Sequence, residues 1–276
     1  MVARSLPRAL EDGSDVDASG APDEVAKAGR EGEALVWHAS SGVGGQDPVS
    51  LVVVTGAFRE RAEGRGDRTP LASVSRAALL RNAVASRART YTSRVLRSDA
   101  WGHGADAVVD VLSEAGLTLT DPAAATPGSL DPVALFGLPG GPEASAPALR
   151  FSGAVLATKD LRAGEGVSYG YLYRAAADTR IALVTGGYGQ GVVRSLGGSV
   201  DVSFAGRRHP IVGRVAMDVC VVEIADAAIQ RGDEAVFFGD PARDEPSLGE
   251  WCAVTGLSGG ELATAAGLHA TRRVVG

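Results

Sequence analysis

Hydrophobic and polar residues change their spacing along the chain, and the changes divide it into four segments. In the first segment, residues 1–70, the apolar runs are LVW at 35–37 and LVVV at 51–54. Acidic, Gly-rich and Arg-rich stretches surround both runs. A segment that buries so little apolar surface cannot offset the conformational entropy that ordering would cost. We therefore predict a flexible leader over residues 1–70.

The second segment, residues 71–117, has the spacing of short helices. Ser75 can cap a helix that runs to about Arg89. A second helix is predicted over about 105–115, and Gly116 is placed to end it. Its apolar face repeats at i, i+3, i+4 and i+7, with Val108, Val111, Leu112 and Ala115. The apolar stretch at 94–96 lies between the two helices, so the segment is predicted to be an αβα fragment.

The third and fourth segments predict a linker followed by a β-domain. Residues 118–148 are rich in Pro, Gly and Ala, which is typical of a linker, with one short strand expected at 133–136. Residues 149–276 contain the alternating run 200–204, a long apolar run at 211–224 and the strand-like AVFF at 235–238. Two capping boxes, Ser247–Glu250 and Ser258–Glu261, each open a helix. The chain is thus predicted to be mainly β, with two short helices in its C-terminal domain.

Composition narrows the classes of function. Hydrophobic residues make up 45% of the chain, the net charge is −6 and aromatics are 5%, so neither a nucleic-acid-binding surface nor a stacking platform is indicated. No apolar run is long enough to span a bilayer. The start has no apolar stretch of signal-peptide length, and Cys220 and Cys252 are too few for a disulfide scaffold. We therefore expect a cytoplasmic protein.

Three stretches of the β-domain resemble the C-terminal domain of bacterial alanine racemases, which use pyridoxal phosphate (PLP) to interconvert L- and D-alanine. They are AGEGVSYG at 163–170, GYGQGVVR at 187–194 and PIVGRVAMD at 210–218, in the order of the family. The resemblance covers about residues 149–276. It implies that Tyr169 corresponds to a catalytic base that serves the barrel of a partner subunit. It also implies that Tyr188, Met217 and Asp218 line the substrate entrance.

The chemistry of these residue types leaves other interpretations open. A phenol acts as a base near neutral pH only beside positive charge, so Tyr169 alone could equally be a packing residue. Met217 lies in an apolar run and could belong to the core, and Asp218 could be a turn or strand-end residue. Gln190 stands where the family usually has aspartate.

The αβα fragment carries a second resemblance and a departure from the family. RSDAWGHG at 97–104 resembles the cofactor-lysine segment KADAYGHG of the racemases. Arg97 stands in place of the lysine that forms the Schiff base, and Trp101 replaces a tyrosine that lies beside the cofactor phosphate. A guanidinium, with a pKa above ~12, is not an amine nucleophile. All but two of the 27 basic residues are arginines, so only two lysines could form a Schiff base.

Chain length also departs from the family. A (β/α)8 barrel needs ~250 residues, whereas the interval from Leu71 to Pro139 holds 69. We therefore expect no PLP on this chain, and we interpret it as a racemase relative that retains the β-domain without most of the barrel. Its expected partners are a second copy or a full-length alanine racemase, and a small amino-acid ligand is possible.

Other motifs in the chain favour different chemistry only weakly. GVSYG at 166–170 matches the nucleophile elbow G-x-S-x-G but lacks the strand–turn–helix that the elbow requires. GGYGQG at 186–191 lacks the Lys-Ser/Thr of a phosphate-binding loop, and no His or Cys spacing indicates a metal. Two hypotheses remain: a chain that contributes Tyr169 to a shared racemase site, and a non-catalytic binding or regulatory β-domain.

Overall fold

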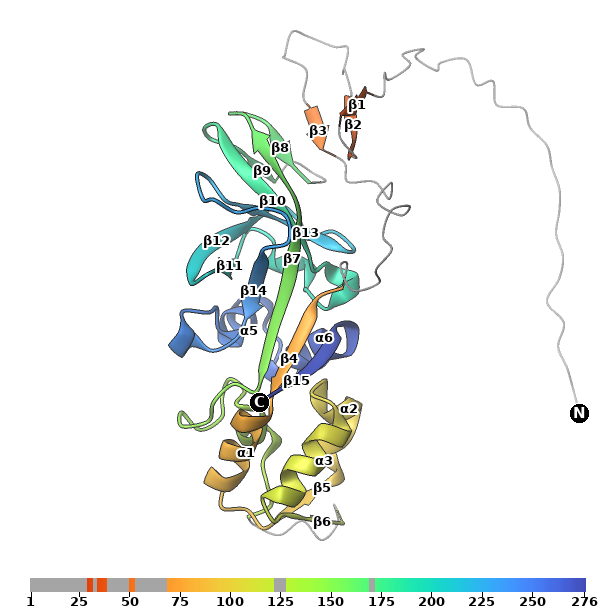
Figure 1. Ribbon diagram of the computed structural model, residues 1–276, viewed down its shortest axis with the longest axis vertical. Coiled ribbons are helices and arrows are strands. Elements are labelled where there is room, and N and C mark those ends of the chain that lie inside the picture. Colours follow the sequence, from red (N-terminus) through yellow and green to blue (C-terminus); the bar gives the residue numbers. More distant parts are fainter. Residues whose placement is uncertain (1–28, 32–33, 39–49, 53–68, 122–127, 169–171) are drawn as a thin grey trace, which may run out of the picture.

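A ring of antiparallel strands forms the centre of the computed structural model (Figure 1). The structure describes residues 29–31, 34–38, 50–52, 69–121, 128–168 and 172–276. The ring runs in the order β10-β13-β12-β11-β14-β7 and closes because β7 also pairs with β10. Its strands are β7 (Leu149–Leu161), β10 (Thr179–Thr185), β11 (Asp201–Phe204), β12 (Arg207–Val212), β13 (Val219–Glu223) and β14 (Glu234–Phe238).

Among the described strands, β7 is the longest, and it pairs with three others. Its N-terminal half pairs with β14, with Ser152 opposite Val236, and its C-terminal half pairs with β10, with Lys159 opposite Ile181. The start of β7 also pairs with β4 (Leu71–Ser75), which in turn pairs in parallel with β15 (Thr271–Val275). Strand β4, which lies just before the first predicted helix, therefore joins the sheet of the β-domain.

Short strands complete the described sheets. β8 (Gly166–Val167) pairs with β9 (Tyr173–Arg174) and, in parallel, with β3 (Ser50–Val52). β3 continues through β2 (Ala34–His38) to β1 (Gly29–Glu31), so the apolar runs of residues 1–70 overlap strands. Most of the predicted leader lies outside the described residues, and its flexibility stays a prediction.

Helices α1 (Arg76–Ala85) and α3 (Ala105–Glu114) confirm the two helices expected in the second segment. The Ser75 hydroxyl accepts a hydrogen bond from the Ala78 amide at 3.1 Å, as an N-cap does. Gly116 follows α3 with φ +74°, the left-handed conformation that ends a helix. The strand placed at 94–96 was wrong, because those residues lie in a 3-10 turn. The strand is β5 (Thr90–Thr92), which pairs in parallel with β6 (Thr118–Thr120).

The strand predicted at 133–136 was also wrong. Residues Pro132–Phe136 form helix α4, because Asp131 caps its first turn by accepting from the Val133 amide at 3.0 Å. Proline at the first helical position is pre-organised for a helix, and the left-handed Gly137 ends it. The Asn82 side chain ties α4 to α1, since its amide donates to the Leu135 carbonyl at 2.9 Å. The residues expected to form a linker thus contribute to the core.

The two capping boxes are confirmed. Helix α5 (Leu248–Thr255) begins after Ser247 and helix α6 (Gly259–His269) after Ser258. In each, the glutamate at the third helical position accepts a hydrogen bond from the backbone amide of the capping serine. The mainly β fold class predicted from the sequence is confirmed.

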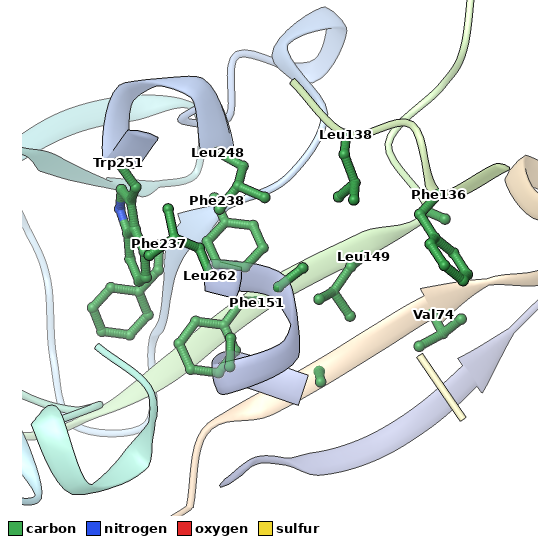
Figure 2. Packing of buried hydrophobic residues seen from close by; sticks show 14 of the residues in the cluster. Val74, Phe136, Leu138, Leu149, Phe151, Phe237, Phe238, Leu248, Trp251 and Leu262 are labelled. Atoms are coloured by element: carbon green, nitrogen blue, oxygen red, sulfur yellow. The ribbon is translucent and has the colours of Figure 1, made fainter. Parts of the chain in front are cut away.

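An aromatic cluster fills the space between the sheet and α5 (Figure 2). The Phe151 ring of β7 lies 5.4 Å from Phe237 and 5.5 Å from Phe238, between ring centroids. Trp251 of α5 meets Phe238 edge-on at 5.0 Å. All four side chains are fully buried. Aromatic pairs at these distances add to the stabilisation that burial alone gives.

Helix α6 approaches its neighbours at backbone distance. A methyl group at Gly267 would lie 2.2 Å from the carbonyl oxygen of Gly102, and one at Gly102 would lie 2.8 Å from the Ala263 carbonyl oxygen. On the same helix, Ala266 lies 2.7 Å from the position of a methyl at Gly191. Backbone cannot yield as a flexible side chain can, so these glycines are required by contact.

We predict that Gly267→Ala lowers the free energy of unfolding by about 2–3 kcal/mol, because the methyl would separate α6 from Gly102. The matched control is Gly249→Ala in α5, where the nearest atom would be 3.5 Å from the methyl. That variant should be as stable as the parent or slightly more so, since alanine favours a helix over glycine. Urea unfolding measures both; equal stability of the two variants would contradict the close packing of α6.

Candidate functional site

The loops that carry the three racemase-like stretches are joined by hydrogen bonds. The Ser168 hydroxyl accepts from the Arg214 amide at 2.7 Å, which ties the first stretch to the third. The second stretch meets the third through its backbone: the Tyr188 amide donates to the Ala216 carbonyl and the Gly189 amide to the Met217 carbonyl, each at 2.8 Å. The segments predicted to form one site therefore lie together.

Glycine is required where these loops meet. A methyl on Gly187 would lie 2.1 Å from the Met217 carbonyl oxygen. The loop is further closed by Gln190, whose side-chain oxygen accepts from the Gly186 amide at 3.0 Å. The residue that departs from the family at this position thus supports the shape of its own loop.

The predicted entrance residues are exposed. Tyr188 is 41% exposed and Met217 57% exposed, and Asp218 lies beside them on the surface. The interpretation of Met217 as a core residue was therefore wrong. The Arg194 guanidinium stands 5.3 Å from the centre of the Tyr188 ring, a cation–π distance. Tyr169 lies outside the described residues, next to the anchored Ser168.

The segment at 97–104 folds as an irregular turn rather than a regular helix. α2 (Arg97–Trp101) contains consecutive non-glycine residues, Ser98 to Trp101, with φ between +51° and +55°. Such a run is costly and persists only where surroundings hold it. Asp99 provides one such contact, because its carboxylate pairs with Arg272 at 2.6 Å and accepts from the Ala105 amide at 2.7 Å. The Ala105 amide first, and Arg272 with it, lower the pKa of Asp99.

Helix α6 connects the two halves of the racemase-like sequence. Gly102 of the 97–104 segment packs on α6 at Gly267, and Gly191 of the second stretch packs on the same helix at Ala266. Sequence analysis did not anticipate this link. Its signal is the small-residue content of the helix, GGELATAAGLH.

His103 is the one fully buried histidine among the described residues. Its ring stacks on Phe136 at 4.1 Å between centroids, and its Nδ1 lies 3.0 Å from the Ala100 carbonyl oxygen. The Nε2 atom has no hydrogen-bond partner. Burial, the largest cause, lowers the pKa of His103 to about 4, so the ring is neutral at pH 7.

The residues present do not fit covalent PLP. Arg97 is exposed at the start of α2 and offers no amine. The Trp101 ring packs against α6, where a methyl at Gly260 would lie 2.4 Å from it, and its indole N–H donates to the Arg94 carbonyl at 3.1 Å. That nitrogen is therefore engaged within the protein. Neither residue lines two cavities formed by described residues, one of about 310 and one of about 640 Å³.

The described residues contain no cluster of three or more His, Cys, Asp or Glu able to hold a metal ion. None of their helices combines the length and hydrophobicity that crossing a membrane requires.

Comparisons with known proteins identify the class to which this fold and these loops belong. The family model for the alanine racemase C-terminal domain matches residues 148–274. The alanine racemase of Mycobacterium leprae is 46% identical over 120 residues, which are 43% of this chain and 31% of that protein. The alanine racemase of Mycobacterium avium is 38% identical over 159 residues, 55% of this chain and 41% of that protein.

The fold agrees with these sequence matches. The crystal structure of alanine racemase from D-cycloserine-producing Streptomyces lavendulae superposes with a TM-score of 0.67 at 19% identity, covering 78% of this chain and 98% of that one. The chain is therefore similar, over residues 148–274, to the C-terminal domain of the alanine racemases. It spans 31–41% of the length of these curated relatives.

We predict that His103 makes the protein less stable in acid. The pKa of His103 is lowered from 6.5 to about 4 on folding. Below pH 6.5 the unfolded chain gains a proton that the folded chain does not, so the stability present above pH 6.5 is lost progressively down to pH 4. The loss from this residue should be about 3 kcal/mol.

The measurement compares urea unfolding of the parent chain and of His103→Phe between pH 7 and pH 4. The variant has no titrating ring at position 103 and should lose less stability on acidification. His269→Phe, at an exposed position, is the control and should follow the parent. Identical pH dependence of parent and His103→Phe would contradict the buried neutral ring.

Proposed function

We propose that this chain serves as a C-terminal-domain partner of a full-length alanine racemase in the cytoplasm. It contributes Tyr169 as a base to the other protein's PLP barrel and catalyses no racemisation alone. The observation that carries this proposal is that hydrogen bonds hold the three racemase-like loops together, with Tyr188 and Met217 exposed, while Arg97 occupies the lysine position. The residue before Tyr169 is thus anchored, while Arg97 offers no amine to hold the cofactor.

The described residue next to Tyr169 in the sequence, and the loops tied to it, support this role. Ser168, directly before it, is fixed to Arg214. Met217 and Tyr188 lie on two loops that backbone hydrogen bonds join, and both side chains are exposed to solvent. An exposed Met and an exposed Tyr on adjoining loops are suited to contact an amino-acid substrate or a protein surface.

The first test concerns the proposal that this chain holds no cofactor of its own. We predict that neither the purified chain nor Arg97→Lys shows PLP-derived absorbance or racemises alanine, because a single lysine does not rebuild the missing barrel. Spectra after incubation with PLP and a D-alanine assay check this. Turnover in Arg97→Lys would show that a working cofactor site exists.

The second test measures the shared site directly. A full-length racemase whose own Ser-Tyr-Gly tyrosine is changed to phenylalanine is mixed with this chain at micromolar concentration. We expect racemisation to return, because Tyr169 supplies the missing base across the interface. Tyr169→Phe in this chain should abolish the rescue, whereas Tyr91→Phe, a buried tyrosine of β5, should not.

Co-elution of the two proteins is followed on the same samples by size-exclusion chromatography. If racemisation does not return and the two proteins do not co-elute, the proposal is refuted. Rescue that persists in Tyr169→Phe would refute the assigned role of that residue.

A further inference from the structure

The larger of these two cavities lies at the junction of β11 and β14. It has a volume of about 640 Å³, which is within the range of small-molecule sites. Within the described residues, β11 and β14 are joined at a single register pair, Ser203 with Val236. The loops after β11, before β14 and after β14 form its walls. None of the loops at 168, 186–191 or 213–218 lines it.

Ser203 lies in this cavity as a buried hydroxyl without a partner. Alternation along β11 predicts an exposed side chain, opposite the buried Val202, yet Ser203 is only 1% exposed. Its Oγ makes no hydrogen bond. A buried hydroxyl left unpaired costs free energy, and a ligand that bonds to it would recover that cost.

The acidic groups of the cavity already have partners. Arg150 donates to both oxygens of Glu234, at 2.6 and 2.9 Å, and to Glu245 at 2.7 Å. Glu245 also accepts from the Asp240 amide, and Asp233 accepts from the Gln230 amide. The carboxylates are thus engaged within the protein, and they offer a weak site for a cation.

Unlike Arg150, one other arginine of the cavity has free hydrogen-bond donors. The Arg207 guanidinium forms no hydrogen bond or ion pair with the part of the chain that the structure describes, and it lines the cavity from β12. Arg243 faces it from the loop after β14, and the His209 ring, held edge-on against Phe204 at 5.5 Å, completes that wall. Guanidinium groups recognise phosphates and carboxylates with paired hydrogen bonds.

Apolar side chains supply the rest of the lining. Phe204, Ile229 and Val236 border the cavity, and each is less than a tenth exposed. A ligand with an anionic group and an apolar body would satisfy both kinds of surface.

We propose that this cavity binds a small organic anion, with its phosphate or carboxylate at Arg207, Arg243 and Ser203 and its apolar part against Phe204 and Ile229. The site is independent of the proposed role of Tyr169.

The experiment titrates the full chain with phenyl phosphate, benzoate and inorganic phosphate by calorimetry at low ionic strength. We expect phenyl phosphate or benzoate to bind with a Kd below about 1 mM, and inorganic phosphate to bind at least tenfold more weakly because it lacks the apolar part. The preferred anion distinguishes a phosphorylated from a carboxylated ligand.

Two variants and a matched control locate the site. Arg207→Gln should weaken binding at least tenfold and Ser203→Ala several-fold. Arg208→Gln, one residue along, should not change it, because the Arg208 guanidinium is committed to Glu250 at 2.8 Å on the other face of β12. Circular-dichroism melting confirms that each variant is folded. The proposal would be overturned if neither organic anion binds with a Kd below about 1 mM. It would also be overturned if Arg207→Gln and Arg208→Gln weaken binding equally.

Discussion

Backbone contact along helix α6 is the constraint on which the arrangement of the racemase-like segments depends. Gly267 packs against Gly102, and its neighbour Ala266 packs against Gly191. No side chain larger than these would let both loops reach the helix. The helix itself is fixed at its start by the capping box of Ser258 and Glu261. A segment from the αβα fragment and a loop of the β-barrel are thereby held in one body.

The β-domain can keep its fold without a complete (β/α)8 barrel because its stabilising contacts are internal. The strand ring closes through β7, and the Phe151, Phe237, Phe238 and Trp251 side chains fill the space beneath α5. β4 and β15 extend the same sheet toward α1–α3, so the αβα fragment is attached to the domain by hydrogen-bonded strands (Figure 1). A change within the segment at 97–104 therefore need not disturb the loops at 186–191 and 213–218.

Local signals in the sequence predicted local structure well. The serine caps of α1, α5 and α6 were found because a capping residue and its partner lie three positions apart. Helix α4 was missed because VALF reads as a strand, although Asp131 and Pro132 before it are helix-start signals. Each part of the candidate site that is a continuous motif could be predicted from the sequence. These motifs indicated that the loops of Tyr188 and Met217 belong together.

Non-local contacts could not be predicted in this way. Nothing near Gly102 in the sequence indicates that it meets Gly267, and the burial of Ser203 depends on loops that follow β11 and β14. The exposure of Met217 likewise results from how its loop is tied to Gly189, not from the apolar run that contains it. Such features arise from tertiary packing that overrides local pattern.

Hydrogen exchange of this chain, measured by mass spectrometry with and without a full-length alanine racemase, tests the central claim most directly. If the chain docks through its racemase-like loops, amides in 168–174, 186–191 and 214–218 should exchange more slowly in the mixture. Amides in the loops around Arg207 and Arg243, which line the larger cavity, should exchange at the same rate with and without the racemase. Protection that is absent from all three loops, or that falls only on the loops around Arg207 and Arg243, would contradict the account.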